Sequence, residues 1–142
     1  MLQLHLLRES WQKLGLRAAW VTLEREDAYT LLAGEDVTFA HGPTTRSVTN
    51  LCRNLLLAWR LVRRRRPRVI ITTGAGIAVP FSWVGRLFGA STVYVESLTR
   101  VERPSLSCRL VRPIADRVYG QWPELESPRW GLRYAGQVVE RP

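Results

Sequence analysis

The sequence of 142 residues is poor in cysteine, and this shortage excludes several classes of protein. Its two cysteines, Cys52 and Cys108, are far apart and form no C-x-x-C pair. We therefore expect neither a disulfide framework nor a zinc site, and a reducing compartment fits better. No acidic cluster has the pattern of a metal site, so the sequence predicts no metal and no cofactor.

Long apolar runs are also lacking. The most apolar stretch, residues 74–90, contains Pro80 and Arg86. It falls short of the ~20 apolar residues that a membrane-spanning helix needs. The first residues lack the basic start, apolar run and small-residue cleavage site of a signal peptide. We therefore expect any membrane attachment to be peripheral.

Positive charge, in contrast, is abundant. The formal net charge is +9, and Lys13 is the only lysine, so arginine supplies almost all of it. A strongly basic domain implies an anionic partner such as nucleic acid, acidic lipid or a phosphorylated substrate. Six arginines lie at the end of the strongest predicted helix: Arg60, Arg63, Arg64, Arg65, Arg66 and Arg68.

This arginine run has two interpretations. Cations at a helix C-terminus are favoured by the helix dipole, so a solvated charge run is one of them. Next to anionic lipid, however, each such residue contributes ~1 kcal/mol of attraction. No stacked-aromatic platform or recognition helix accompanies the charge, so nucleic acid is not the expected partner. We expect the following residues to face a membrane: Arg63, Arg64, Arg65, Arg66, Phe81 and Trp83.

Helical and extended patterns alternate along the chain, which is long enough for a single domain over residues 1–142. Strands are predicted over residues 18–23, 36–40, 68–73, 91–96 and 117–122. Helices are predicted over residues 2–14, 27–32, 47–65, 76–88 and 104–111. This alternation is typical of an α/β fold with a Rossmann-like parallel sheet and helices on both faces.

Two features of this pattern are specific. The chain begins directly in a helix, so the first strand of such a sheet is expected to be missing. In the helix over residues 47–65, an apolar face is formed by Leu51, Leu55, Trp59 and Val62, which are spaced about four residues apart.

Two glycines follow the third predicted strand, in the sequence T-T-G-A-G. Gly74 and Gly76 allow a tight turn, and the helix that follows offers free N–H groups to an anion. Ligands of parallel sheets bind beyond the carboxyl ends of the strands, where this turn lies. A plain strand-to-helix connection is the alternative. A dinucleotide fingerprint is not expected, because Val79 replaces its third glycine and Pro80 follows.

The loop after the fourth predicted strand carries acid and arginine side chains. Glu96 is the first polar residue after an apolar strand, and its carboxylate could orient a sugar hydroxyl. Arg100 and Arg103 could clamp a phosphate, because guanidinium groups form charge-assisted, often bidentate bonds to its oxygens. In the alternative interpretation Glu96 pairs with Arg100, and Pro104 and Ser105 start a helix.

Several segments together have the order and spacing of one known family. They are W-V-T at residues 20–22, T-x-R-x-x-x-N formed by Thr44, Arg46 and Asn50, T-T-G-A-G-I-A-V-P-F at 72–81, Y-V-E-S-x-x-R-V-x-x-P-S-L at 94–106, P-x-A-D at 113–116 and Q-W at 121–122. They resemble the bacterial polysaccharide-biosynthesis protein PssD and its eukaryotic relative, Alg-fourteen. That family resembles the N-terminal half of MurG-type GT-B glycosyltransferases, split off as its own polypeptide.

The resemblance implies a membrane-associated subunit on the cytoplasmic face that binds a lipid-diphosphate-linked acceptor. A partner like PssE or Alg-thirteen would supply the half that binds UDP-sugar, in an inverting, metal-independent reaction. It also implies that the acceptor site is lined by Thr73, Gly74, Gly76, Glu96, Ser97 and Arg100. Among them Glu96 is the candidate catalytic base. Members of the family begin with a strand and a G-G-H-L turn, which this sequence lacks.

Two other functions stay open on the sequence alone. The chain could be a non-enzymatic module that tethers a catalytic partner to the membrane, or a basic nucleic-acid-binding domain.

Overall fold

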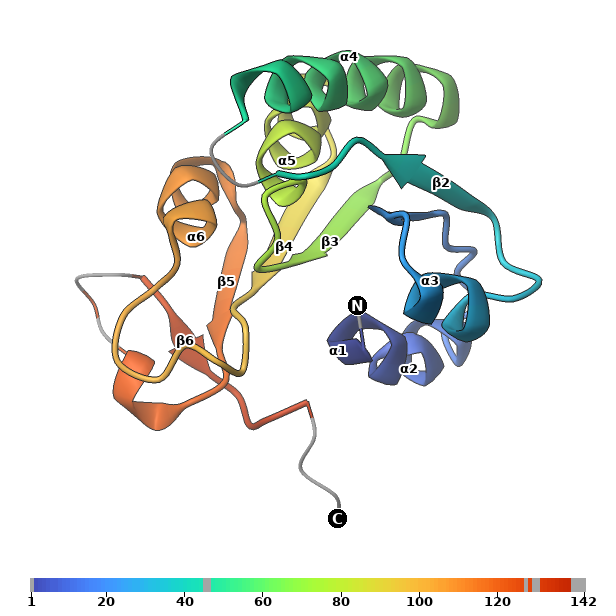
Figure 1. Cartoon of the computed structure of the whole chain (residues 1–142). Helices are drawn as coiled ribbons and strands as arrows, with labels where there is room; N and C mark the ends of the chain where they lie inside the picture. Colours follow the sequence, from blue (N-terminus) through green and yellow to red (C-terminus); the bar gives the residue numbers. More distant parts are fainter. Residues whose placement is uncertain (1, 45–46, 127, 129–130, 139–142) are drawn as a thin grey trace.

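A computed structural model describes residues 2–44, 47–126, 128 and 131–138 (Figure 1). The helices are α1 (Leu2–Leu6), α2 (Arg8–Gln12), α3 (Glu26–Leu31), α4 (Val48–Arg65), α5 (Ala78–Leu87) and α6 (Leu106–Val111), with 3₁₀ turns η1 (Arg112–Ile114) and η2 (Pro123–Leu125). The strands are β1 (Trp20–Leu23), β2 (Val37–Ala40), β3 (Val69–Thr73), β4 (Ser91–Val95), β5 (Arg117–Gly120) and β6 (Arg133–Tyr134).

The strands form two parallel sheets, which confirms the predicted α/β class. β1 pairs with β2, and the second sheet has the order β3-β4-β5-β6. Within the described ranges no strand is hydrogen-bonded between β1 and β3, so β1 and β2 form a sheet of their own. Val21 of β1 and Ile70 of β3 nevertheless pack against one cluster on α4 and α5, so the two sheets share a helical layer.

Helices lie on both sides of β3, as predicted: Figure 1 shows α4 and α5 above it and α1 and α2 below it. α5 is the central helix and contacts α4, α6, β3 and β4. Its Phe81 and Val84 pack against Ala58 and Val62 of α4. Phe81 is therefore in the core, because its position on α5 faces α4, and its predicted place on a membrane-facing surface is wrong. Trp83, on another face of α5, is 42% exposed.

The buried face of α4 is not the face that carries its leucines. Its buried residues are Asn50, Asn54, Ala58 and Val62. Of the predicted apolar face only Val62 is buried, whereas Leu51, Leu55 and Trp59 are 46%, 47% and 44% exposed.

Hydrogen bonds to the segment after β2 explain this orientation. The Asn54 Oδ1 accepts the His41 N–H at 2.7 Å, and its Nδ2 donates to the His41 carbonyl at 2.8 Å. Asn50 Nδ2 donates to the Pro43 carbonyl at 2.9 Å. Ser47 caps the helix by accepting the Asn50 N–H. The backbone groups of His41 and Pro43 thereby gain partners, which an apolar face could not supply.

The two bonds of Asn54 give a test of this orientation. We expect Asn54→Ala to lower the free energy of unfolding by about 1–3 kcal/mol, because it leaves backbone groups of His41 without a partner. Urea unfolding followed by circular dichroism measures this. The neighbouring exposed Thr49→Ala is the control and should change stability little. Equal stability of the two variants would contradict the proposed role of Asn54.

Candidate functional site

The turns that follow β2, β3 and β4 meet at the carboxyl ends of these strands. A Cβ atom added to Gly76 would lie 2.7 Å from Thr44 Cβ, so the turn after β3 touches the segment after β2. A Cβ added to Gly74 would lie 3.2 Å from both Glu96 Oε1 and Ser97 Cβ, so the same turn also touches the loop after β4. The structure therefore brings Gly74, Gly76, Glu96 and Ser97 together, as the sequence predicted.

Glycine at these positions has a steric cause. At Gly76 any side chain would collide with Thr44, whose Cβ is close to its own backbone and cannot easily move away. α5 begins immediately afterwards, and Pro80 fits its first turn because that position needs no N–H partner. In the described part of the chain no hydrogen bond uses the N–H of Gly76 or Ile77. These free donors and the helix dipole suit an anion.

Glu96 is fully buried at the end of β4. Its Oε1 accepts the Ser97 N–H at 2.9 Å, and its Oε2 accepts the Ser105 N–H at 2.7 Å. It makes no described ion pair with Arg100, so the alternative pairing is wrong too. Because both oxygens are occupied and shielded from solvent, the geometry argues against Glu96 as the catalytic base. It clamps the two ends of the loop over residues 97–104.

Further bonds extend this clamp into the core. Ser105 caps α6 by accepting the Cys108 N–H at 3.1 Å, and it shares a 3.0 Å hydrogen bond with the Tyr94 hydroxyl.

Gln121 Nε2 donates to the Glu96 carbonyl at 2.8 Å, and Trp122 Nε1 donates to the Leu98 carbonyl at 2.7 Å. In the sequence the Q-W pair is visible only as a motif. Its hydrogen bonds to the loop join distant segments, which residue spacing does not reveal.

The same surroundings shift two proton equilibria. Burial raises the pKa of the Cys108 thiol to about 12, and the nearby Glu96 carboxylate adds to the effect. Burial also raises the pKa of Tyr94 well above its usual range. Both side chains are therefore neutral near pH 7.

The remaining predicted site residues are less buried than Glu96. Thr73 ends β3 opposite Val95 and is half-buried. Arg100 and Arg103 are exposed on the loop over residues 97–104. Arg46, part of the motif after β2, lies outside the described residues.

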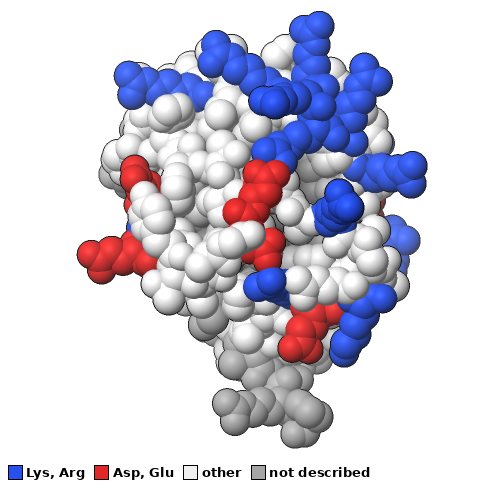
Figure 2. Space-filling view, turned by 90° about the vertical axis from the view of Figure 1, so that its right-hand side faces the viewer, with Lys and Arg blue, Asp and Glu red and all other residues white. Residues whose placement is uncertain are grey.

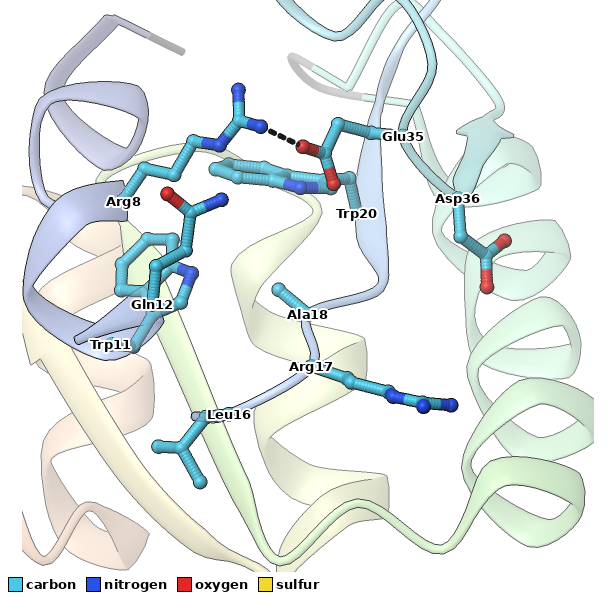
Figure 3. Close-up of a pocket in the computed structure, with 9 residues that line it drawn as sticks. All are labelled: Arg8, Trp11, Gln12, Leu16, Arg17, Ala18, Trp20, Glu35 and Asp36. Carbon is cyan, nitrogen blue, oxygen red and sulfur yellow. Dashed lines mark ion pairs between the residues drawn. The ribbon is translucent and has the colours of Figure 1, made fainter. Parts of the chain in front are cut away.

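A hollow of about 370 Å³ lies elsewhere, at the amino ends of β1 and β2 (Figure 3). Trp11 and Trp20 form one wall, with ring centroids 5.7 Å apart. Arg8 pairs with Glu35 across its mouth at 2.5 Å. None of the predicted acceptor residues lines it.

Two of the predicted membrane-facing arginines end α4 close to this hollow. The two terminal nitrogens of Arg65, Nη1 and Nη2, bind the Asp36 carboxylate, and this hydrogen bonding lowers the pKa of Asp36. The charge of Arg65 is therefore partly neutralised, whereas Arg66, which follows it at the end of the helix, forms no such ion pair with a described residue. Figure 2 shows the basic side chains gathered along the upper edge of this face, over the end of α4.

Comparisons with known proteins place the chain in a family. Residues 37–138 match the family described as "Oligosaccharide biosynthesis protein Alg14 like". The chain belongs to this Alg14-like family. It is 33% identical over 118 residues to the UDP-N-acetylglucosamine transferase subunit ALG14 of Eremothecium gossypii, covering 77% of this chain and 53% of that protein. It is 32% identical over 99 residues to the corresponding subunit of Yarrowia lipolytica, covering 66% and 46%.

The fold of the Alg14-like chain resembles part of a solved structure. It superposes on MurG of Acinetobacter baumannii with a TM-score of 0.77 at 12% identity, covering 99% of this chain and 42% of that one. The predicted resemblance to half of MurG is thus confirmed for the fold. The Alg14-like chain spans about half the length of the relatives it matches. In the part that the structure describes, no helix is long and apolar enough to cross a bilayer.

The two hydrogen bonds of Glu96 predict that a substitution at this position lowers the stability of the protein. In Glu96→Gln one oxygen becomes an NH₂ group that faces a backbone N–H, so we expect a loss of about 1–3 kcal/mol in the free energy of unfolding. Alkylation of the buried Cys108 should also become faster, since a less stable protein opens more often and exposes this thiol. Glu102→Gln, an exposed change on the same loop, is the control. An unaltered unfolding midpoint in Glu96→Gln would show that the clamp is not needed.

Proposed function

We propose that this chain is the acceptor-side subunit of a two-component UDP-N-acetylglucosamine transferase in oligosaccharide or polysaccharide biosynthesis. In this proposal it binds a lipid-diphosphate-linked acceptor at the cytoplasmic face of the membrane, and a catalytic subunit like Alg-thirteen or PssE binds the UDP-sugar. The observation that carries the proposal is the meeting of three turns at the carboxyl ends of β2, β3 and β4, with unbonded N–H groups at Gly76 and Ile77. The Alg14-like family and the MurG-like fold support it.

The acceptor diphosphate would bind at the N-terminus of α5. The N–H groups of Gly76 and Ile77 donate to its oxygens, and Arg100 and Arg103 approach from the loop after β4. Glu96 acts as a positioning residue, because it fixes the ends of the loop that carries both arginines. The acceptor hydroxyl then attacks the anomeric carbon of the sugar held by the partner, and the bond to UDP breaks. The base that takes the hydroxyl proton is a group other than the buried Glu96.

The membrane-facing surface in this proposal is the outer face of α4 rather than Phe81. It has an apolar part composed of Val48, Leu51, Leu55, Leu56, Trp59, Leu87 and Phe88, all exposed. Trp59 packs edge-to-face on Phe88 with ring centroids 5.0 Å apart, which joins α4 to the end of α5. Beside it lies a basic part composed of Arg53, Arg60, Arg63 and Arg64. An apolar stripe next to a basic one is typical of helices that lie in a membrane interface.

Transfer activity tests the acceptor site. With the chain co-expressed with its UDP-sugar-binding partner, we expect Gly76→Ala to lower kcat/KM for the lipid acceptor about 10- to 100-fold, because the added methyl displaces the turn. Combining it with Thr44→Gly removes the collision and should restore part of the activity. Arg100→Ala with Arg103→Ala should raise KM for the acceptor. If all these variants transferred sugar like the wild type, the acceptor site would be elsewhere, and a purely tethering role would be favoured.

Vesicle binding tests the membrane surface separately. We expect Leu55→Asn with Trp59→Asn to weaken co-sedimentation with phosphatidylglycerol vesicles about tenfold or more, because two apolar side chains no longer enter the interface. Leu14→Asn with Tyr29→Asn removes two even more exposed apolar groups, 74% and 54%, outside this surface and is the control. Equal weakening in both pairs would contradict the assignment of α4.

A further inference from the structure

Three arginines surround a second hollow, of about 200 Å³, at the amino ends of β5 and β6. Arg112 comes from η1, Arg117 is the first residue of β5, and Arg133 is the first residue of β6. The hollow is on the opposite edge of the sheet from the acceptor turns, because those follow the carboxyl ends of β3 and β4 and all strands of this sheet are parallel. None of its lining residues belongs to the proposed acceptor site.

The register of the sheet brings the arginines together. Tyr119 of β5 pairs with Arg133 of β6, and Arg117 lies two residues before Tyr119. Side chains two apart on a strand share a face, so Arg117 and Arg133 are diagonal neighbours on adjacent strands. Arg112, from η1, lines the same hollow. Its Nε would lie only 3.2 Å from a Cβ added to Gly131, whose backbone has φ 61°.

The charge in this hollow is unbalanced. In the described ranges none of the three arginines forms an ion pair with a carboxylate. The one acid in the lining, Asp116, is already engaged: its Oδ2 accepts the Thr92 N–H at 2.8 Å, and its Oδ1 lies 3.5 Å from Arg86 Nη1. Arg117 donates only to the Asp116 backbone carbonyl, at 2.9 Å. Cations held close together repel unless an anion lies between them.

We propose that this hollow, formed by Arg112, Arg117 and Arg133, binds a phosphate group. Guanidinium groups present paired N–H donors that match phosphate oxygens, and several of them around one hollow make a multidentate site. A volume of about 200 Å³ exceeds the roughly 30 Å³ that one water occupies in the liquid, so a phosphate and its nearest waters fit. The phosphate belongs either to a soluble phosphate compound or to an anionic lipid headgroup. The site is independent of the proposed acceptor site and does not rest on it.

The test compares two double variants that each remove two positive charges. Arg117→Ala with Arg133→Ala changes the hollow, whereas Arg17→Ala with Arg25→Ala changes exposed arginines on either side of β1. Binding of inorganic phosphate and of pyrophosphate is measured by calorimetry at low salt. Binding to phosphatidylglycerol vesicles, with phosphatidylcholine vesicles as the neutral reference, is measured by co-sedimentation. Circular dichroism confirms that each variant is folded, and Arg117→Lys with Arg133→Lys keeps the charge but removes the paired donors.

We expect the hollow variant to weaken binding of at least one phosphate source about tenfold or more, and the control pair to weaken it much less. The lysine variant should lie between them. Loss in calorimetry identifies a soluble phosphate, and loss confined to vesicles identifies a lipid headgroup. The proposal is overturned if the wild type binds neither source, or if the hollow variant and the control pair lose affinity equally. Intact sugar transfer in the hollow variant leaves the proposed function standing in either case.

Discussion

The buried carboxylate of Glu96 is the interaction on which the candidate site depends. A carboxyl group removed from water is costly unless its oxygens are hydrogen-bonded, and here both are, to the N–H groups of Ser97 and Ser105. Those two residues begin and end the loop that carries Arg100 and Arg103. The two hydrogen bonds of one buried side chain thus tie together the ends of nine residues of backbone, from Ser97 to Ser105.

The same carboxylate also restricts its neighbours. Gly74 has little room for a side chain, because Glu96 Oε1 lies 3.2 Å from where a Cβ would be. Ser105 can cap α6 because its own N–H is held by Glu96. Gln121, which follows β5, donates a hydrogen bond to the backbone carbonyl of Glu96. Several contacts therefore connect the turns after β3, β4 and β5 to one another.

The polarity of the parallel sheet separates the surfaces of the molecule. The carboxyl end of β3 carries the glycine turn and free N–H groups, while the amino ends of β5 and β6 carry arginines. α4 lies across the top of the structure in Figure 1 and exposes apolar side chains on its outer face. Its inner face holds two asparagines, because the loop after β2 presents backbone groups there that need partners. The usual arrangement of a surface helix, apolar inside and polar outside, is partly reversed.

Sequence patterns by themselves determined the class of the fold and the position of the candidate site. Alternating strand and helix periods imply parallel βαβ units, and T-T-G-A-G placed the tight turn where the structure has it, because these signals are local. Only the tertiary structure decided which face of α4 is covered, that Phe81 is buried, and that Glu96 is a clamp. Periodicity shows which residues share a face but not what covers it. Hydrogen bonds such as those of Asn54 with His41, or Gln121 with Glu96, join segments whose meeting depends on the whole chain.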